Sequence, residues 1–144
     1  MKNYRTWLTI AIVLQLLTGL IHGVALFISP QPSNDSEKQL VDLFTGQQMD
    51  MGAGYHRTLY DLFMSVSTCF TLLFLFGGVL NWYLFRKRIA NDVLAGILVI
   101  QIVIFGVGFA VMLVFAFLPP IVLSGLVFLV LALARLTIPG AKTS

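Results

Sequence analysis

Charged side chains are scarce in this 144-residue chain: they make up 10% of it, against the roughly 25% that is usual in soluble domains. The apolar residue set AVILMFWYC reaches 58%. A soluble fold of this length exposes a large fraction of its surface and cannot hide so much apolar side chain. The shortage of charge therefore excludes an ordinary soluble domain and predicts that the lipid bilayer is the solvent of most of the chain.

Residues of catalytic and metal-binding chemistry are also few. The single cysteine, Cys69, excludes an intrachain disulfide and a cysteine-based metal site. No phosphate-binding loop, nucleophile motif or CxxC pair occurs in the sequence. The net charge of +3 comes from basic residues beside apolar runs, which is typical of topology signals and not of nucleic-acid binding. We therefore expect a protein without nucleic acid partners and, as the leading hypothesis, a non-catalytic one.

Four apolar runs are long enough to cross a hydrocarbon core of about 30 Å as helices. We expect transmembrane helices over about residues 7–29, 58–85, 92–117 and 119–137. The first run exceeds a signal-peptide core and is followed by no small-x-small cleavage site, so we interpret it as a retained helix. Pro119 and Pro120 fall in the first turn of the fourth helix, where proline is tolerated. The predicted fold class is all-α: one membrane domain over 1–144, built as a four-helix transmembrane bundle.

The outer loop, residues 30–57, is the only long connection in the chain. Pro30 and Pro32 are expected to stop the first helix. Asn34, with Glu37 three residues later, resembles a helix N-cap with its capping partner. An apolar stripe follows, consisting of Leu40, Val41, Leu43 and Phe44. This pattern predicts a short amphipathic helix on the membrane surface that ends at about Gln48.

Positive charge predicts the orientation of the helices. With the N-terminus in the cytoplasm, seven basic residues lie inside: Lys2, Arg5, Arg86, Lys87, Arg88, Arg135 and Lys142. Two lie outside, Lys38 and Arg57. The aromatic belts agree, with Trp7, Trp82 and Tyr83 at the inner interface and Tyr55 and Tyr60 at the outer one. We expect a bacterial inner-membrane protein with both termini in the cytoplasm.

Polar side chains within the expected spans are the main functional clue, because such groups are costly in hydrocarbon. They follow helical spacing: Gln15, Thr18 and His22 on the first helix, Arg57, Asp61, Ser65 and Thr68 on the second, and Gln101 on the third. Helical rise places Gln15 and Gln101 at a similar depth, about 12–14 Å from the inner ends of their helices. These two amides are therefore expected to pair across helices.

The other polar residues suggest a ligand-binding cluster that opens outward, lined by His22, His56, Arg57, Tyr60 and Asp61. In it Asp61 orients His22, a side chain that titrates near neutral pH. The alternative is structural: Asp61 pairs with Arg57 or with His22, and these bonds hold the helices in register. Both interpretations stay open at this point.

Two metal sites are conceivable, although no bound metal or cofactor is the leading expectation. His22 and His56 are possible axial ligands of a haem iron. Met49, Met51 and His56 carry ligands that suit Cu(I). Neither set is specific, because the chain has two histidines and Met-x-Met pairs occur often by chance.

Two stretches are similar to a family of small four-span bacterial membrane proteins that have no established activity. They are Thr18–Gly23 (TGLIHG) and Gly54–Met64 (GYHRTLYDLFM). In that family a Gly/His pair ends the first helix, and an Arg-Ser-x-x-Asp-aromatic segment, often followed by Gly-x-Gly, opens the second. This chain departs from the pattern with Thr58 in place of Ser and with Met64–Val66 where the glycines are expected. The resemblance implies four helices and a characteristic polar set of His22, Arg57 and Asp61.

The sequence as a whole favours an accessory subunit or a small-ligand binder with its polar cluster between the first two helices. A membrane oxidoreductase component or haem/quinone carrier is the first alternative, and an oligomeric transporter component is the second. The expected partners are the lipid bilayer and either other membrane subunits or further copies of the chain.

Overall fold

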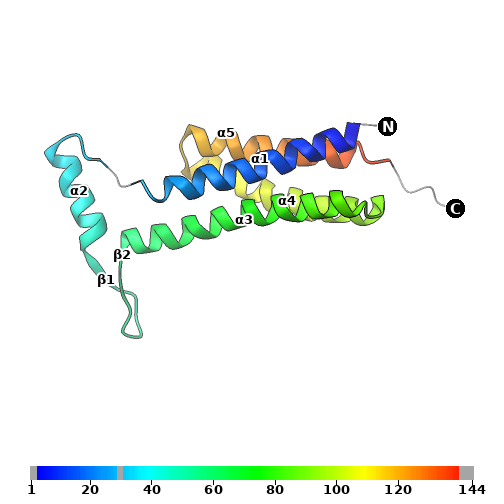
Figure 1. The fold of residues 1–144 in the computed structure, drawn as a ribbon. Coiled ribbons are helices and arrows are strands. Elements are labelled where there is room, and N and C mark those ends of the chain that lie inside the picture. The colour runs from blue at the N-terminus through cyan, green and yellow to red at the C-terminus, as the bar shows by residue number, and fades with distance from the viewer. Residues whose placement is uncertain (1–2, 29–30, 140–144) are drawn as a thin grey trace. The chain divides into compact units, whose positions relative to one another are not determined.

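The computed structural model describes residues 3–28 and 31–139. Within them the chain forms five helices and one short hairpin, in the order α1 Asn3–Ala25, α2 Asp35–Gly46, β1 Gln48–Asp50, β2 His56–Thr58, α3 Leu59–Lys87, α4 Asn91–Phe115 and α5 Leu118–Leu136 (Figure 1). Helices α1, α3, α4 and α5 are long and apolar enough to cross a membrane. The predicted all-α fold with four membrane helices is therefore confirmed, and the chain is a multi-pass membrane protein.

Helix α1 ends earlier than the sequence predicted, at Ala25 instead of residue 29. The amides of Phe27 and Ile28 bond to carbonyls three residues back at 3.1 Å, and the Leu26 amide is shared between the carbonyls of His22 and Gly23 at 3.3 Å. Such bonds tighten the chain into turns narrower than an α-helix, so apolar character continues past the point where the helix stops. Residues 29 and 30, and with them the predicted stop at Pro30, lie outside the described residues.

The N-terminus of α2 follows the predicted capping pattern. The Asn34 side chain accepts a hydrogen bond from the Glu37 amide at 2.9 Å, and the Glu37 carboxylate accepts one from the Ser33 amide at 2.6 Å. These bonds from Ser33 stabilise the charged carboxylate and lower the pKa of Glu37. The helix ends at Gly46, slightly before the predicted Gln48, where β1 begins.

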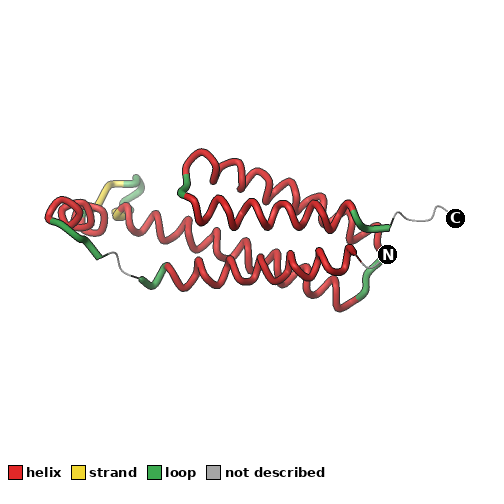
Figure 2. Tube along the Cα trace, turned by 90° about the horizontal axis from the view of Figure 1, so that it is seen from above, coloured by secondary structure: helices red, strands yellow, loops and turns green. Residues whose placement is uncertain are grey.

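The hairpin between α2 and α3 was not predicted. Strands β1 and β2, drawn in yellow in Figure 2, pair in antiparallel orientation. Asp50 is opposite His56 in this pairing. The turn contains three consecutive residues with positive φ, Gly52 at 84°, Ala53 at 53° and Gly54 at 80°. Glycine adopts positive φ without steric cost, which explains why Gly52 and Gly54 occur in this turn. Strands of three residues are too short for an alternating pattern to reveal them.

The chain divides into two compact units. Unit one consists of Met1–Thr18 with Phe74–Ser144, and unit two is Gly19–Leu73. In the described residues, every buried apolar side chain belongs to unit one: Leu8, Ala11, Ile12, Phe74, Leu84, Leu94, Leu98, Phe105, Val127, Val130, Leu131 and Ala134. Helices α4 and α5 pack together in this unit, and Phe74 of α3 contacts Phe105 of α4 edge to face at 5.0 Å.

Small residues bring α1 and α3 close together in unit one. A Cβ atom built on Gly78 would lie 2.8 Å from the Leu16 side chain, and one on Gly77 would lie 2.6 Å from the Gln15 amide nitrogen. Glycine at these positions lets the two helix backbones approach, as small residues do in membrane helix pairs. Gly77 and Gly78 are thus packing positions.

Candidate functional site

A cluster of three side-chain amides lies in the core of unit one. Asn81 donates to the side-chain oxygens of Gln15 and Gln101, both at 2.8 Å. Gln101 donates back to Asn81 at 2.9 Å, and Gln15 donates to Gln101 at 3.2 Å. All three side chains are buried, and they come from α1, α3 and α4. We call Gln15, Asn81 and Gln101 the amide triad.

The predicted pairing of Gln15 with Gln101 is present, but Asn81 was missed. It stands beside Trp82, in a stretch expected at the membrane interface. Asn81 follows Gly77 by four residues and Gly78 by three, so it lies on the packed face of α3. This spacing is the sequence feature from which its burial could have been predicted. No member of the triad titrates, so the cluster joins three helices and does not transfer protons.

Thr18, one turn after Gln15, is 4% exposed. Its hydroxyl oxygen is buried and has no hydrogen-bond partner. A threonine hydroxyl in a helix commonly bonds to the carbonyl four residues earlier, and here it does not.

Asp61 caps helix α3. Its carboxylate accepts a hydrogen bond from the Thr58 amide at 3.0 Å, and its own amide donates to the Thr58 hydroxyl at 3.1 Å. This reciprocal pair is a capping box, with aspartate in the place usually taken by glutamate. Within the described residues the carboxylate forms no hydrogen bond or close ion pair with Arg57 or His22, although the Arg57 charge acts on it electrostatically. Its direct partner is Thr58, and not the Arg57 or His22 of the structural alternative. The Arg-Thr-x-x-Asp segment thus has a local structural role at a helix start.

His22 faces the middle of α3 in unit two. Its ring meets Phe70 edge to face at 5.0 Å and lies near the backbone of Ser67. The Nε2 atom is buried without a partner. Asp61 lies six residues before Ser67, or about 9 Å along the helix axis, so it does not orient this imidazole.

The remaining residues of the predicted ligand cluster form contacts with their near neighbours or lie exposed. Arg57 donates to the His56 carbonyl at 2.9 Å and lies over the Tyr55 ring at 5.9 Å. His56 is exposed in β2, opposite Asp50. Tyr60 contacts Phe44 of α2 edge to face at 6.0 Å. The five residues lie in one unit, but these contacts do not direct them toward a common centre.

The hydroxyl groups predicted as intramembrane polar sites on α3 bond within their own helix. Ser65 donates to the Asp61 carbonyl at 2.8 Å, and Thr68 donates to the Met64 carbonyl at 2.7 Å. Both residues are exposed on the helix surface. Such bonds satisfy the hydroxyl without a partner from another helix.

Over residues 3–28 and 31–139, no group of three or more His, Cys, Asp or Glu side chains is placed to hold a metal ion. The haem and Cu(I) alternatives use other ligand sets, and they stay predictions.

Unit two contains an apolar cleft of about 610 Å³. It lies among the end of α1, helix α2 and the start of α3, and its walls include Leu26, Ile28, Gln31, Phe44, Tyr60 and Phe63. Phe44 contacts the rings of Tyr60 and Phe63 at 6.0 and 6.1 Å, so α2 forms one wall against α3. Of the predicted ligand residues, Tyr60 lines this cleft, whereas Arg57 and Asp61 line a separate hollow on α3.

No protein-family model, curated protein or solved structure matches the chain. The resemblance of the two sequence motifs to a family of four-span membrane proteins therefore stays a prediction.

Proposed function

We propose that this membrane protein binds a small amphipathic molecule in the apolar cleft of unit two. The cleft carries the proposal: its volume of about 610 Å³ falls in the range of roughly 300–1,000 Å³ that is common for small-molecule sites. Such sites combine apolar walls with a few polar groups.

The lining indicates the chemistry of the ligand. Leu26, Ile28 and Phe63 offer apolar contact, whereas the Tyr60 hydroxyl and the Gln31 amide offer hydrogen bonds. None of the lining residues carries a charge at neutral pH. The matching ligand has an apolar body and an uncharged polar group, a class that includes quinones and neutral lipids. The lining contains no nucleophile with a neighbouring base, which favours binding over catalysis.

An accessory subunit is the second candidate, and the surface of α2 favours it. Leu40 and Leu43 are 67% and 58% exposed on this helix, outside the four membrane-spanning candidates. A membrane surface or a partner protein would remove them from water, and a partner would make the chain part of a larger assembly.

We further propose a bacterial inner membrane and cytoplasmic termini, so that the cleft faces outward. The arginines at the end of α3 and in the last turn of α5 support this orientation through the positive-inside rule. Lys2 and Lys142 also support it from the sequence, although both lie outside the described residues.

Cysteine labelling tests the orientation in a Cys69→Ser background. A membrane-impermeant maleimide should label Ser36→Cys, in α2, in intact spheroplasts, whereas Ala90→Cys, between α3 and α4, should react only after lysis. The opposite result would reverse the topology.

Native mass spectrometry of protein released gently from its own membrane tests the binding function. The wild type should retain a small-molecule mass. Phe44→Ala opens the cleft and Leu26→Trp fills it, so both should lose that mass. Phe76→Ala removes an exposed ring outside the cleft and should keep it. Bare monomer from the wild type would contradict ligand binding, and added polypeptide mass would favour the accessory subunit.

A further inference from the structure

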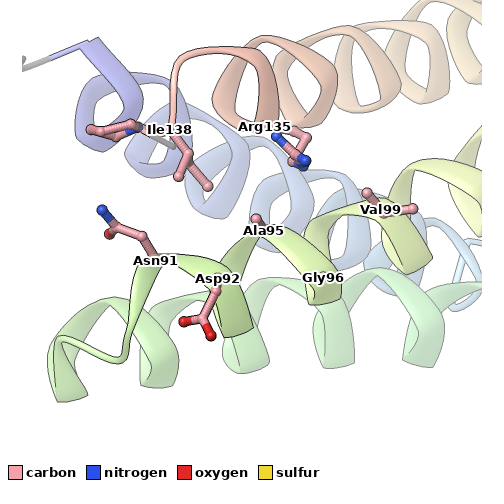
Figure 3. A pocket seen from close by; sticks show the side chains of 8 residues that line it. Asn91, Asp92, Ala95, Gly96, Val99, Arg135 and Ile138 are labelled. Carbon is pink, nitrogen blue, oxygen red and sulfur yellow. The ribbon is translucent and has the colours of Figure 1, made fainter. Parts of the chain in front are cut away.

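A second cleft, of about 380 Å³, lies in unit one where α4 begins and α5 ends (Figure 3). Its lining includes Asn91, Asp92, Ala95, Val99, Arg135 and Ile138. Asn91 is the first residue of α4, and Arg135 is in the last turn of α5. Because both helices are membrane-spanning candidates, their ends place this cleft at a boundary between hydrocarbon and water.

Arg135 lacks a hydrogen-bond acceptor. Its Nε atom is buried and has no partner, and no ion pair joins its guanidinium to a carboxylate in the described part of the chain. A guanidinium stays charged at all relevant pH values, and its fork of N–H groups matches the oxygens of a phosphate group. An unsatisfied donor on a residue that lines a cleft indicates that the cleft takes an acceptor.

The wall beside Arg135 is apolar and shallow. Ala95 and Val99 line it on α4, and a Cβ atom built on Gly96 would meet nothing within 4 Å. This strip runs from the start of α4 into its membrane-spanning part. A ligand with an anionic head and an acyl chain can place its head at Arg135 and its chain along the strip.

Asp92 is the acidic residue in this lining. Figure 3 shows its carboxylate pointing away from Arg135. Because Asp92 lines the cleft, its negative charge weakens the attraction for an anion.

We propose that this cleft binds the phosphate group of an anionic phospholipid, with Arg135 as the hydrogen-bond donor. The acyl chain then lies against the strip formed by Ala95, Gly96 and Val99. This site is separate from the apolar cleft of unit two, and it takes a charged headgroup instead of a neutral ligand.

Titrations followed by native mass spectrometry in a neutral detergent test this site with three probes: dioleoylphosphatidylglycerol, dioleoylglycerol and inorganic phosphate. The phospholipid should bind one to one, and both other probes should bind weakly. Equal binding of dioleoylglycerol would show that acyl chains alone suffice and would overturn the proposal. Binding of inorganic phosphate as tight as that of the phospholipid would make this a free-anion site and would also overturn it.

Variants locate the binding. Arg135→Gln should weaken phospholipid binding about fivefold, the contribution expected of one basic residue near a headgroup. Arg135→Lys should retain part of the affinity, and Asp92→Asn should increase it. Arg86→Gln is the matched control, because it removes the same charge from an exposed arginine that lies over Trp82 at 5.8 Å. An equal loss in Arg86→Gln and Arg135→Gln would show that general basic charge attracts the lipid and would refute the cleft.

Discussion

Replacing Asn81 with alanine tests the amide triad, which joins three of the four membrane helices. The substitution removes three hydrogen bonds, two that Asn81 donates and one that it accepts. Interhelical hydrogen bonds in membrane proteins contribute on average about 0.6 kcal/mol each, so the bonds alone amount to about 2 kcal/mol. The change also leaves the Gln15 side-chain oxygen without a donor in a buried site, which adds to the loss.

Unfolding of the purified protein in mixed micelles, titrated with SDS and followed by circular dichroism, measures this loss. We expect Asn81→Ala to lower the free energy of unfolding by about 2 kcal/mol or somewhat more. The control is Thr68→Ala on the same helix, whose hydroxyl bonds only to the Met64 carbonyl. An exposed substitution of this kind should change the free energy by no more than about 0.5 kcal/mol.

A double-mutant cycle measures the interaction free energy between two members of the triad. Asn81 and Gln101 exchange two hydrogen bonds, so the loss in the double variant Asn81→Ala/Gln101→Ala should be smaller than the two single losses added together. A loss in Asn81→Ala as small as that in Thr68→Ala would refute the triad as a source of stability, and strict additivity in the cycle would show that the two amides do not interact.

Three further predictions concern local structure. Thr58→Ala removes the hydroxyl bond of the α3 capping box and should cost about 1 kcal/mol of unfolding free energy in chemical denaturation. The Thr58 amide remains in this variant, so adding Asp61→Ala removes the second bond and should cause a further loss; no further loss would contradict the role of the carboxylate in the cap. The pKa of Glu37 is lowered in the folded state, so its stabilisation of α2 is present above the ordinary pKa of about 4.5 and is lost as the pH falls through the lower folded value. NMR of the α2 amides should therefore show fraying of the helix in acid, and Glu37→Gln should abolish this pH dependence. An unchanged acid transition in that variant would count against the cap. Gly78→Ala places a methyl group against Leu16 and should destabilise unit one by about 1–3 kcal/mol in SDS titration, whereas a neutral effect would show that the helices do not approach closely there.

The sequence predicted the number of membrane helices because each apolar run has both the length and the continuity that a bilayer requires. It also predicted the Asn34 cap and the pairing of Gln15 with Gln101, since both follow from spacing along a helix. The end of α1 was predicted too late, because hydrophobicity reports burial in lipid and does not report where α-helical hydrogen bonding changes to tighter turns.

The polar cluster was harder to predict. Spacing places His22 and Asp61 in neighbouring helices at similar depths, but the rotation of each helix about its axis decides which side chains meet. Local bonds also replace the expected contacts between helices. Asp61 forms the α3 capping box with Thr58, and Arg57 donates to the His56 carbonyl and lies over the Tyr55 ring. The apolar cleft depends on how α2 folds back onto α3 through Phe44, a tertiary contact with no short-range pattern.

Ligand binding in the apolar cleft is the central claim, and site-specific photocrosslinking in living cells tests it most directly. The photoreactive residue p-benzoylphenylalanine replaces Phe44 in the cleft wall and, as a control, the exposed Phe76 of α3. We predict that mass spectrometry of the digested protein finds a defined small-molecule adduct at position 44 that is absent at position 76. The same bilayer lipids at both positions, or adducts only with other polypeptides at position 44, would contradict the account.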